Sequence, residues 1–380
     1  MKNNNAIIYY NDNGLNIYYN NKCYLFSNIL SNFILNFSNQ IFASSMNNIY
    51  LPKKIFKLDA NILNIDTITL KFPFERGFIY QDFSLYEYPK YYSPTFDYEN
   101  TESRYYLGVY SIANKTINNL NFTIPKGDDI FQQSIECSDG TYRNSILFVA
   151  DMQGNILWTW DLYEYLKNNN LSLLEHPIIQ TASRLGKNYL NLNENDIVIS
   201  ISKRNQILII NPLNNNIDLK IDTSWFNRTI TSFCDAHIIP FGLPGGGQNL
   251  LFYNHNRNNK NLTEILEYDI INKRVIFEYS SDLLNSNRSI VGSVQKLENG
   301  NYLIYNYEKS NLFEITNQKE YVFIYKIKDE TADLSSKELR QTRGTHCSRA
   351  QQVPFHWVNQ LIKNHDLINN LKGKNNNEFM

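Results

Sequence analysis

A strand-turn-strand unit recurs along the second half of this chain and constrains its fold more than any other feature. Each copy has an apolar, β-branched run, a turn of two or three residues rich in Asn, Gly or Lys, and a second run rich in aromatic residues. Four copies begin at Leu147, Ile207, Ile265 and Leu312, and their turns centre on Gly154, Asn215, Asn272 and Gln318. The spacing of about fifty to sixty residues is typical of propeller blades with modest insertions.

Three of these hairpins follow a further strand that a loop introduces, which predicts three strands per unit. The added strands read NENDIVISIS, GGGQNLLFYN and ENGNYLIYNY, before the second, third and fourth copies. A single sheet of this kind cannot bury both of its faces, so successive sheets must stack, and closing them into a ring removes exposed edges. The pattern therefore predicts an all-β fold, a β-propeller built of antiparallel meanders.

The domain organisation follows from where this pattern is regular. We assign residues 1–335 to a single propeller domain whose blades are clearest from 147 to 328, and residues 336–380 to a C-terminal closing segment and polar tail. Before residue 140 the strand-like runs are less regular, and we expect two or three degenerate blades there. The segment DLYEYLKNNN from Asp161 is the best candidate for a short helix.

Composition narrows the classes of partner. The 380 residues are 42% hydrophobic and 14% aromatic, which suits pleated, half-buried strands. With 36 basic and 37 acidic residues the net charge is -1, so we expect neither nucleic-acid nor membrane binding. The polar N-terminus lacks the apolar core of a signal peptide, which favours a cytoplasmic protein; export stays open if the chain is incomplete at that end.

No metal site or cofactor is expected. The four cysteines Cys23, Cys137, Cys234 and Cys347 lie far apart without a C-x-x-C pair, which argues against a zinc site and gives no disulfide framework. Neither G-x-G-x-x-G nor a Walker A motif occurs. The Asn runs, such as Asn214 to Asn216, fall where turns are expected, and we interpret them as filling permissive loops.

One long segment is more specific than the repeat. CDAHIIPFGLPGGGQNLLFYNHNR, from Cys234 to Arg257, resembles the arylsulfotransferase family segment H-D-A-Q, a loop with G-L-P-G-x-G, then N-I-L-x-F-x-N-G-N-x-R. VGSVQKLENGNYLIYNYEKSNLFEIT resembles the family's S-x-A-Q-R-L-P-N-G-N-T-L-I followed by L-F-E-V-T. SRAQQVPFHW from Ser348 and NILWTWDLYEYL resemble two further family stretches. The resemblance covers most of residues 147 to 357.

The resemblance implies a propeller of about six blades with His, Asn and Arg gathered in a central cavity. It also implies an activity, the transfer of a sulfuryl group from an aryl sulfate to a phenol through a sulfated histidine and without a nucleotide donor. Such chemistry needs an imidazole as nucleophile or acid-base catalyst, and Arg and amide donors around the sulfate oxygens. A small aryl sulfate or another anionic ligand is the partner that the resemblance implies.

The candidate catalytic residues are Cys234, Asp235 and His237. Cys234 stands where the family has its histidine, and we favour a small buried residue over a catalytic thiolate. Asp235 keeps the family's acidic position, but an Asp beside a strand start can equally satisfy turn amides. His237 could be a relocated base; regular strand alternation would place it on the face opposite Cys234, which favours a packed or surface histidine.

The candidate substrate-binding residues are Asn254 and Arg257. Arg257 falls on the family's arginine position or one residue short of it, and a solvated loop Arg is the alternative. His255 replaces a family glycine and is by default a turn residue. A second family histidine is absent from TASRLGKNYLNLNEN, where Arg184 or Lys187 could offer only positive charge, and His176, His346 and His356 fit loops or the closing strand better.

Three functions therefore stay open. The first is sulfuryl transfer by an arylsulfotransferase-like propeller, impaired to the extent that its histidines are replaced. The second is a propeller that has lost its catalytic residues and serves as a binding or interaction scaffold. The third is a hydrolase or lyase that binds another anionic ligand through Arg257. The sequence does not give the oligomeric state.

Overall fold

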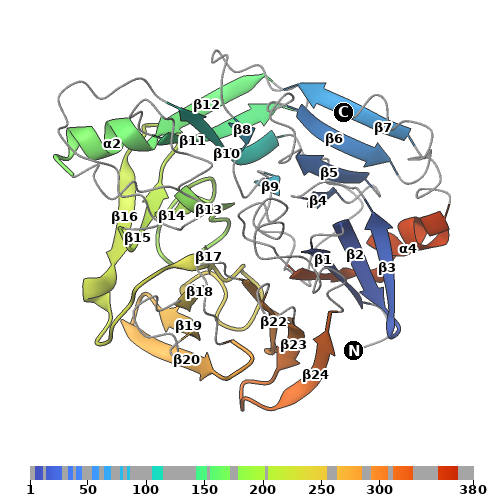
Figure 1. The fold of residues 1–380 in the computed structure, drawn as a ribbon. Coiled ribbons are helices and arrows are strands. Elements are labelled where there is room, and N and C mark those ends of the chain that lie inside the picture. The colour runs from blue at the N-terminus through green and yellow to red at the C-terminus, as the bar shows by residue number, and fades with distance from the viewer. Residues whose placement is uncertain are drawn as a thin grey trace, which may run out of the picture.

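The computed structural model of this protein describes residues 5–11, 14–27, 33–36, 40–44, 54–59, 64–69, 78–79, 84–85, 105–113, 143–151, 155–171, 179–201, 204–254, 263–284, 292–306, 311–327 and 350–366. Its described strands form six antiparallel sheets, five of four strands and one of five. Figure 1 shows these sheets side by side in a ring around a common axis. The predicted β-propeller fold is confirmed.

The order of strands within each sheet is that of the chain, apart from β25, which joins the first sheet. The sheets contain β25 (Ala350–Pro354), β1 (Asn5–Asn11), β2 (Gly14–Tyr19) and β3 (Lys22–Ser27); β4 (Phe33–Asn36), β5 (Gln40–Ser44), β6 (Lys54–Asp59) and β7 (Asn64–Thr69); β8 (Phe78–Ile79), β9 (Ser84–Leu85), β10 (Tyr105–Ala113), β11 (Arg143–Asp151) and β12 (Ile156–Asp161); β13 (Ile179–Arg184), β14 (Ile197–Ile201), β15 (Gln206–Ile210) and β16 (Ile217–Asp222); β17 (Cys234–Ile238), β18 (Asn249–Asn254), β19 (Glu264–Asp269) and β20 (Arg274–Ser280); and β21 (Ser293–Lys296), β22 (Tyr302–Asn306), β23 (Asn311–Ile315) and β24 (Tyr321–Lys326).

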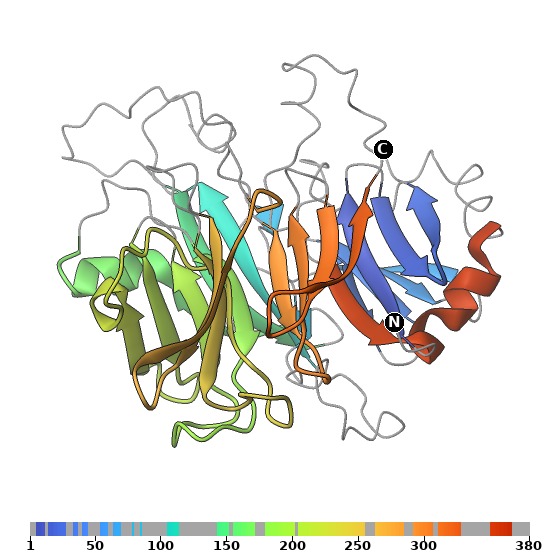
Figure 2. The ribbon, with the colours of Figure 1, turned by 90° about the horizontal axis from the view of Figure 1, so that it is seen from below.

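The first sheet joins the two ends of the described chain. β25 pairs antiparallel with β1, with Ile7 opposite Gln352, so one sheet draws strands from both ends of the sequence. Helix α4 (Phe355–Lys363) follows β25 and lies at the outer side of this sheet (Figures 1 and 2). The ring of Phe355 stacks on Tyr19 with centroids 4.0 Å apart, which fixes the helix against β2.

Apolar residues fill the spaces between successive sheets. The middle strands β14, β18 and β22 are buried along their whole length, because neighbouring sheets cover both of their faces. Four clusters of buried residues lie between the sheets that run from β8 round to β3, and one of them joins Tyr9 of β1 to Tyr305 of β22. The core is therefore a series of layers between blades.

The outermost strands of four sheets share one irregularity. In β12, β16, β20 and β24 the pairing register shifts by one residue, which leaves Leu157, Asp218, Ile276 and Val322 as the extra residues of β-bulges. All four side chains are exposed. A bulge increases local twist and interrupts an edge that another strand could otherwise extend.

Several local predictions are confirmed. Helix α2 (Leu162–Asn168) occupies the predicted segment, and the Asp161 side chain accepts the N–H of Glu164 as its N-cap. The predicted turns at 215, 272 and 318 each contain or adjoin a left-handed residue, namely Asn215, Lys273 and Lys319. The turn at Gly154 lies outside the described residues.

The prediction of three strands per unit is wrong, because each sheet from β13 onward has a fourth, innermost strand. These strands are β13, β17 and β21, and they are short and carry polar residues within buried backbone. In the described part of the chain, no helix is long and apolar enough to cross a membrane.

Candidate functional site

The motif residues Cys234, Asp235 and His237 lie on β17, the innermost strand of its sheet. Cys234 is opposite Tyr253 of β18, and His237 is opposite Leu251, so two residues of β17 are inserted between positions that are only two apart on β18. Asp235, at the start of this irregularity, has a left-handed backbone with φ 50°. The sequence folds this way because Asp tolerates the left-handed region better than a bulky or β-branched residue does.

The bulge puts Cys234 and His237 on the same face of the sheet. Residues directly opposite each other in a ladder project to the same side, and Tyr253 and Leu251 both belong to the cluster between the sheets β17–β20 and β21–β24. Cys234 belongs to that cluster too, whereas Ala236 and Ile238 face the preceding sheet. Opposite faces, as regular alternation predicts, are therefore wrong here, because β17 is not regular.

Both side chains are packed inside the protein. Cys234 is 2% exposed and His237 is 7% exposed. The Cys234 thiol donates to Ser232 Oγ at 3.5 Å, and His237 Nδ1 is 2.9 Å from the carbonyl oxygen of Asp235. Of the two alternatives for His237, a packed or a surface histidine, the structure shows the packed one.

Asp235 connects β17 to the next sheet. Its carboxylate Oδ2 accepts the backbone N–H of Val294, on β21, at 2.8 Å, and the side chain is buried. A carboxylate that accepts a backbone N–H makes a charge-assisted hydrogen bond, which is stronger than a neutral one. The motif carboxylate therefore ties two innermost strands together.

The same kind of contact joins the innermost strands on either side. Thr181 Oγ1 on β13 donates to the carbonyl of Ala236 at 3.4 Å. Ser293 Oγ on β21 accepts the N–H of Ala350 at 2.9 Å, and Gln295 Oε1 accepts the N–H of Gln352 at 2.7 Å. We call Thr181, Asp235, Ser293 and Gln295 the inner belt. It links β13 to β17, β17 to β21 and β21 to β25, always from a side chain to the backbone of the next innermost strand.

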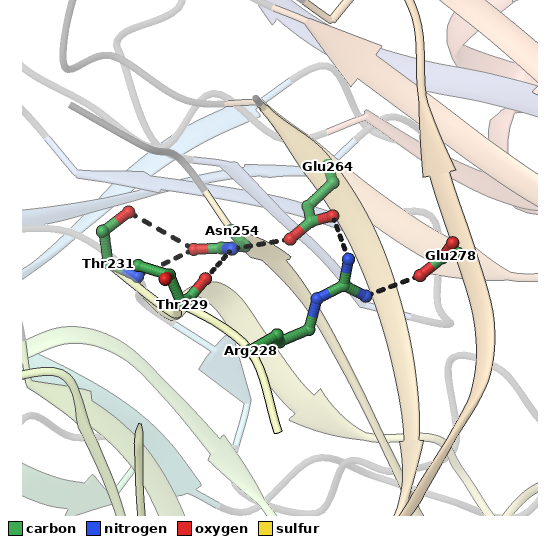
Figure 3. Close-up of polar contacts among 6 residues, drawn as sticks. All are labelled: Arg228, Thr229, Thr231, Asn254, Glu264 and Glu278. Carbon is green, nitrogen blue, oxygen red and sulfur yellow. Dashed lines mark hydrogen bonds and ion pairs between the residues drawn. The ribbon is translucent and has the colours of Figure 1, made fainter. Parts of the chain in front are cut away.

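Asn254 ends β18, and the protein's own groups surround its amide (Figure 3). Its Oδ1 accepts the backbone N–H groups of Thr231 and Ser232 at 3.0 and 3.3 Å. Its Nδ2 donates to the carbonyl of Thr229 at 3.2 Å and to Glu264 Oε1 at 2.8 Å. Both amide hydrogens and the oxygen are thereby engaged, and the segment that leads into β17 is fixed to β18.

This use of Asn254 recurs one sheet further on. Asn306 ends β22 as Asn254 ends β18, and its Nδ2 donates to the carbonyl of Leu283, in the segment that precedes β21, at 2.8 Å. A residue that holds the incoming segment in two successive sheets belongs to the construction of the repeat.

An arginine that the sequence analysis did not single out extends the Asn254 network to the outer strand. Arg228 lies 3.1 Å from Glu264 Oε2 and 2.6 Å from Glu278 Oε2, so it bridges β19 and β20 (Figure 3). The Arg228 guanidinium lowers the pKa of Glu278 by hydrogen bonding. Arg228 and its carboxylates are partly exposed, so the bridge is a modest contribution to stability.

Arg257 and His255 lie outside the described residues, as do His176 and His346. The side chain of His356, in α4, also lies outside what the structure describes. Among these candidates the structure therefore brings together only Cys234, Asp235 and His237, with Asn254 at the far end of the paired strand.

The most buried ionic cluster lies elsewhere, between the sheets β17–β20 and β21–β24. Lys296 Nζ is 3.0 Å from Glu267 Oε2, and the Tyr302 hydroxyl donates to the same oxygen at 2.6 Å. Asn249 Nδ2 donates to the other oxygen, Oε1, at 2.6 Å. All four side chains are buried, and Lys296 Nζ also lies 3.8 Å from the centroid of the Tyr302 ring.

The glycine-rich loop of the resembling segment covers this cluster. A Cβ on Gly245, whose φ is +78°, would lie 2.5 Å from Asn249 Nδ2 and 2.6 Å from Glu267 Oε1, so only glycine lets the loop backbone approach the pair. The sequence signal was present: Asn249 and Lys296 fall within the segments quoted for the resemblance, and Glu267 is a charged residue inside an apolar strand.

Burial shifts the titration of this cluster. Burial lowers the pKa of Lys296, and the neighbouring Glu267 opposes that shift. Burial and the Glu267 carboxylate raise the pKa of the Tyr302 hydroxyl well above its usual range. The tyrosine is therefore a hydrogen-bond donor at neutral pH, and the cluster holds a closed set of one cation and one anion.

Comparisons with known proteins add the fold and nothing finer. No protein-family model matches the chain, and no curated protein matches it. A protein of unknown function from Bacteroides caccae is similar over 92% of this chain and 99% of its own, with 10% identity and a TM-score of 0.48. The apo AztD structure from Citrobacter koseri covers 92% of this chain and 98% of its own, with 10% identity and a TM-score of 0.43.

A third similar structure is virginiamycin B lyase from Staphylococcus aureus. It covers 87% of this chain and 87% of its own, at 11% identity and a TM-score of 0.40. Similarity at this level assigns neither a family nor an activity to the chain.

Proposed function

We propose that this protein is a β-propeller scaffold whose motif residues hold its blades together and do not catalyse a reaction. The observation that carries the proposal is the engagement of Asp235 and Asn254 by backbone groups of neighbouring segments. Binding a sulfate would require these polar groups to leave their present partners. A buried donor or acceptor that loses its partner costs about 1–3 kcal/mol, so such an exchange is unfavourable.

The environment of Cys234 supports the same proposal. Reactive cysteines are thiolates in electropositive, partly exposed surroundings, whereas buried cysteines in apolar surroundings are inert. Cys234 is buried among Leu251, Tyr253 and Val294. A thiol in this position suits packing better than attack on a sulfuryl group.

Sulfuryl transfer is the second candidate, and one observation favours it. The bulge in β17 places Cys234 and His237 on one face, which is the arrangement that a nucleophile and its base require. In that function Cys234 or His237 would accept the sulfuryl group, the aryl alcohol would leave, and a phenol would take the group in a second step. Arg257 would bind the sulfate oxygens.

Turnover of a chromogenic aryl sulfate with excess phenol separates the two functions. The scaffold proposal predicts no release of aryl alcohol above a buffer blank from neutral to alkaline pH. Release that Cys234→Ala or His237→Gln abolishes, while the exposed-turn variant Asn214→Ala retains it, would overturn the scaffold proposal. Asn214 is a suitable control because its side chain makes only one exposed hydrogen bond, to the N–H of Asn216.

A further inference from the structure

Strand β24 presents an apolar edge at the outer rim of the ring (Figure 1). Tyr321, Val322 and Ile324 are 46%, 45% and 51% exposed. Phe323 and Tyr325, which alternate with them, face the first sheet, where Tyr325 lies against Tyr18 with ring centroids 4.6 Å apart. The strand is therefore held in place on one side while its other side meets solvent.

The other outer strands protect their edges differently. In β16 the exposed residues are the charged Asp218 and Lys220, and in β20 the exposed Glu278 pairs with Arg228. Charged residues on an edge strand oppose pairing with another strand. No charged residue interrupts β24 between its two ends, so this edge lacks the protection that β16 and β20 have.

The exposed stripe of β24 is complementary to itself. It runs Glu320, Val322, Ile324 and Lys326, at alternate positions, and begins with an acid and ends with a base. All four residues are exposed. No ion pair involves Glu320 or Lys326 among the residues that the structure describes. Two charges of opposite sign at the ends of an apolar stripe are therefore available to a partner.

We propose that β24 pairs antiparallel with β24 of a second copy of this chain. With Phe323 on the two-fold axis, Val322 lies opposite Ile324 of the other copy, and Glu320 lies opposite Lys326. The contact is isologous, so each favourable pair occurs twice. Opposite charges directly across an antiparallel ladder stabilise it and like charges destabilise it, which fixes both the direction and the register. A second copy is the partner that this charge pattern fits.

Charge reversal at the two ends tests the proposal directly. Sedimentation velocity over a concentration series should give a dimer for the unmodified chain. Lys326→Glu or Glu320→Lys alone should weaken the dimer about tenfold or more, because each reversal creates two like-charge contacts. The double variant Glu320→Lys with Lys326→Glu should restore dimerisation, because the reversed pairs are again opposite in charge.

Two further variants show whether the dimer forms at β24 or at another outer strand. Ile324→Lys should give a monomer, whereas Leu157→Lys, at the 54% exposed bulge residue of β12, should leave the dimer unchanged. Circular dichroism checks that every variant is folded, as is expected for exposed positions. A chain that stays monomeric throughout the series, or a double variant that does not regain the dimer after both single reversals lose it, would overturn the proposal. So would single reversals without effect.

Discussion

Left-handed backbone is concentrated in asparagines in this chain. Asn20, Asn21, Asn170, Asn191, Asn205 and Asn215 are six of the nine non-glycine residues with positive φ among those described. Asn tolerates this region because its short amide hydrogen-bonds to nearby backbone. With only 15 glycines in 380 residues, asparagine takes over much of the turn chemistry that glycine usually provides. The interpretation of the Asn runs as turn-filling residues thus acquires a physical basis at the turns described.

A single buried carboxyl, Asp196, is expected to make stability depend on pH. Burial raises its pKa from 3.8 to about 6, and the nearby Asp218 adds to the shift. The folded protein therefore holds a proton that the unfolded chain releases near pH 4. The stabilisation is complete below that pH and is lost as the pH rises through about 6.

The variant Asp196→Asn should remove this dependence. We expect it to raise the free energy of unfolding by about 1–2 kcal/mol at pH 7.5 and to change it little at pH 4, because Asn is neutral at both. Its Oδ1 can still accept the N–H of Asn193, which Asp196 Oδ2 accepts at 3.1 Å. Denaturant unfolding at the two pH values checks this; an equal effect at both would contradict the assignment.

The conformation of Asp235 could not be read from the sequence. Its residue type was compatible with both a catalytic and a turn-satisfying role, and only the bulge in β17 decides where the carboxylate points. A bulge changes the face of every later residue in its strand, so one left-handed residue reversed the expected relation of Cys234 and His237.

Strands differ in how far the sequence predicts them. The second and third strands of each unit, such as β14, β15, β18 and β19, are apolar runs bounded by turn residues, and they lie where the pattern places them. The innermost β17 and β21 are short and mix polar with apolar residues, because their side chains bond the backbone of the next sheet. Periodicity does not report such strands.

The Lys296 cluster joins four strand segments and is expected to behave as one unit. Lys296→Met leaves the Glu267 charge buried without its cation, and should cost about 3–5 kcal/mol of unfolding free energy. Glu267→Gln should also destabilise, since it leaves the Lys296 ammonium unpaired. The double variant removes both charges and should cost less than the sum of the single variants.

Denaturant unfolding of the three variants completes this double-mutant cycle. Lys220→Met is a matched control, because Lys220 is an exposed lysine on β16 and its replacement should change stability little. Additive effects of the two cluster variants would show that Lys296 and Glu267 are not coupled.

At the scale of the whole molecule, ring closure depends on contacts between sheets. The β25–β1 ladder joins residues from the two ends of the described chain, and the inner belt connects successive sheets from β13 to β25 through single side chains. Residues that resemble an enzyme's motif thus occupy positions where they join blades. A propeller can keep such residues for its architecture after its chemistry has changed.

The exchange of the Val294 amide hydrogen with deuterium tests this account most directly. Asp235→Gly removes the carboxylate while still allowing the left-handed backbone, and Asp235→Asn keeps an oxygen that can accept the same N–H. The account predicts that the glycine variant loses much of the protection at Val294 and that the asparagine variant retains most of it. Unchanged protection at Val294 in the glycine variant would contradict the claim that Asp235 holds these two blades together.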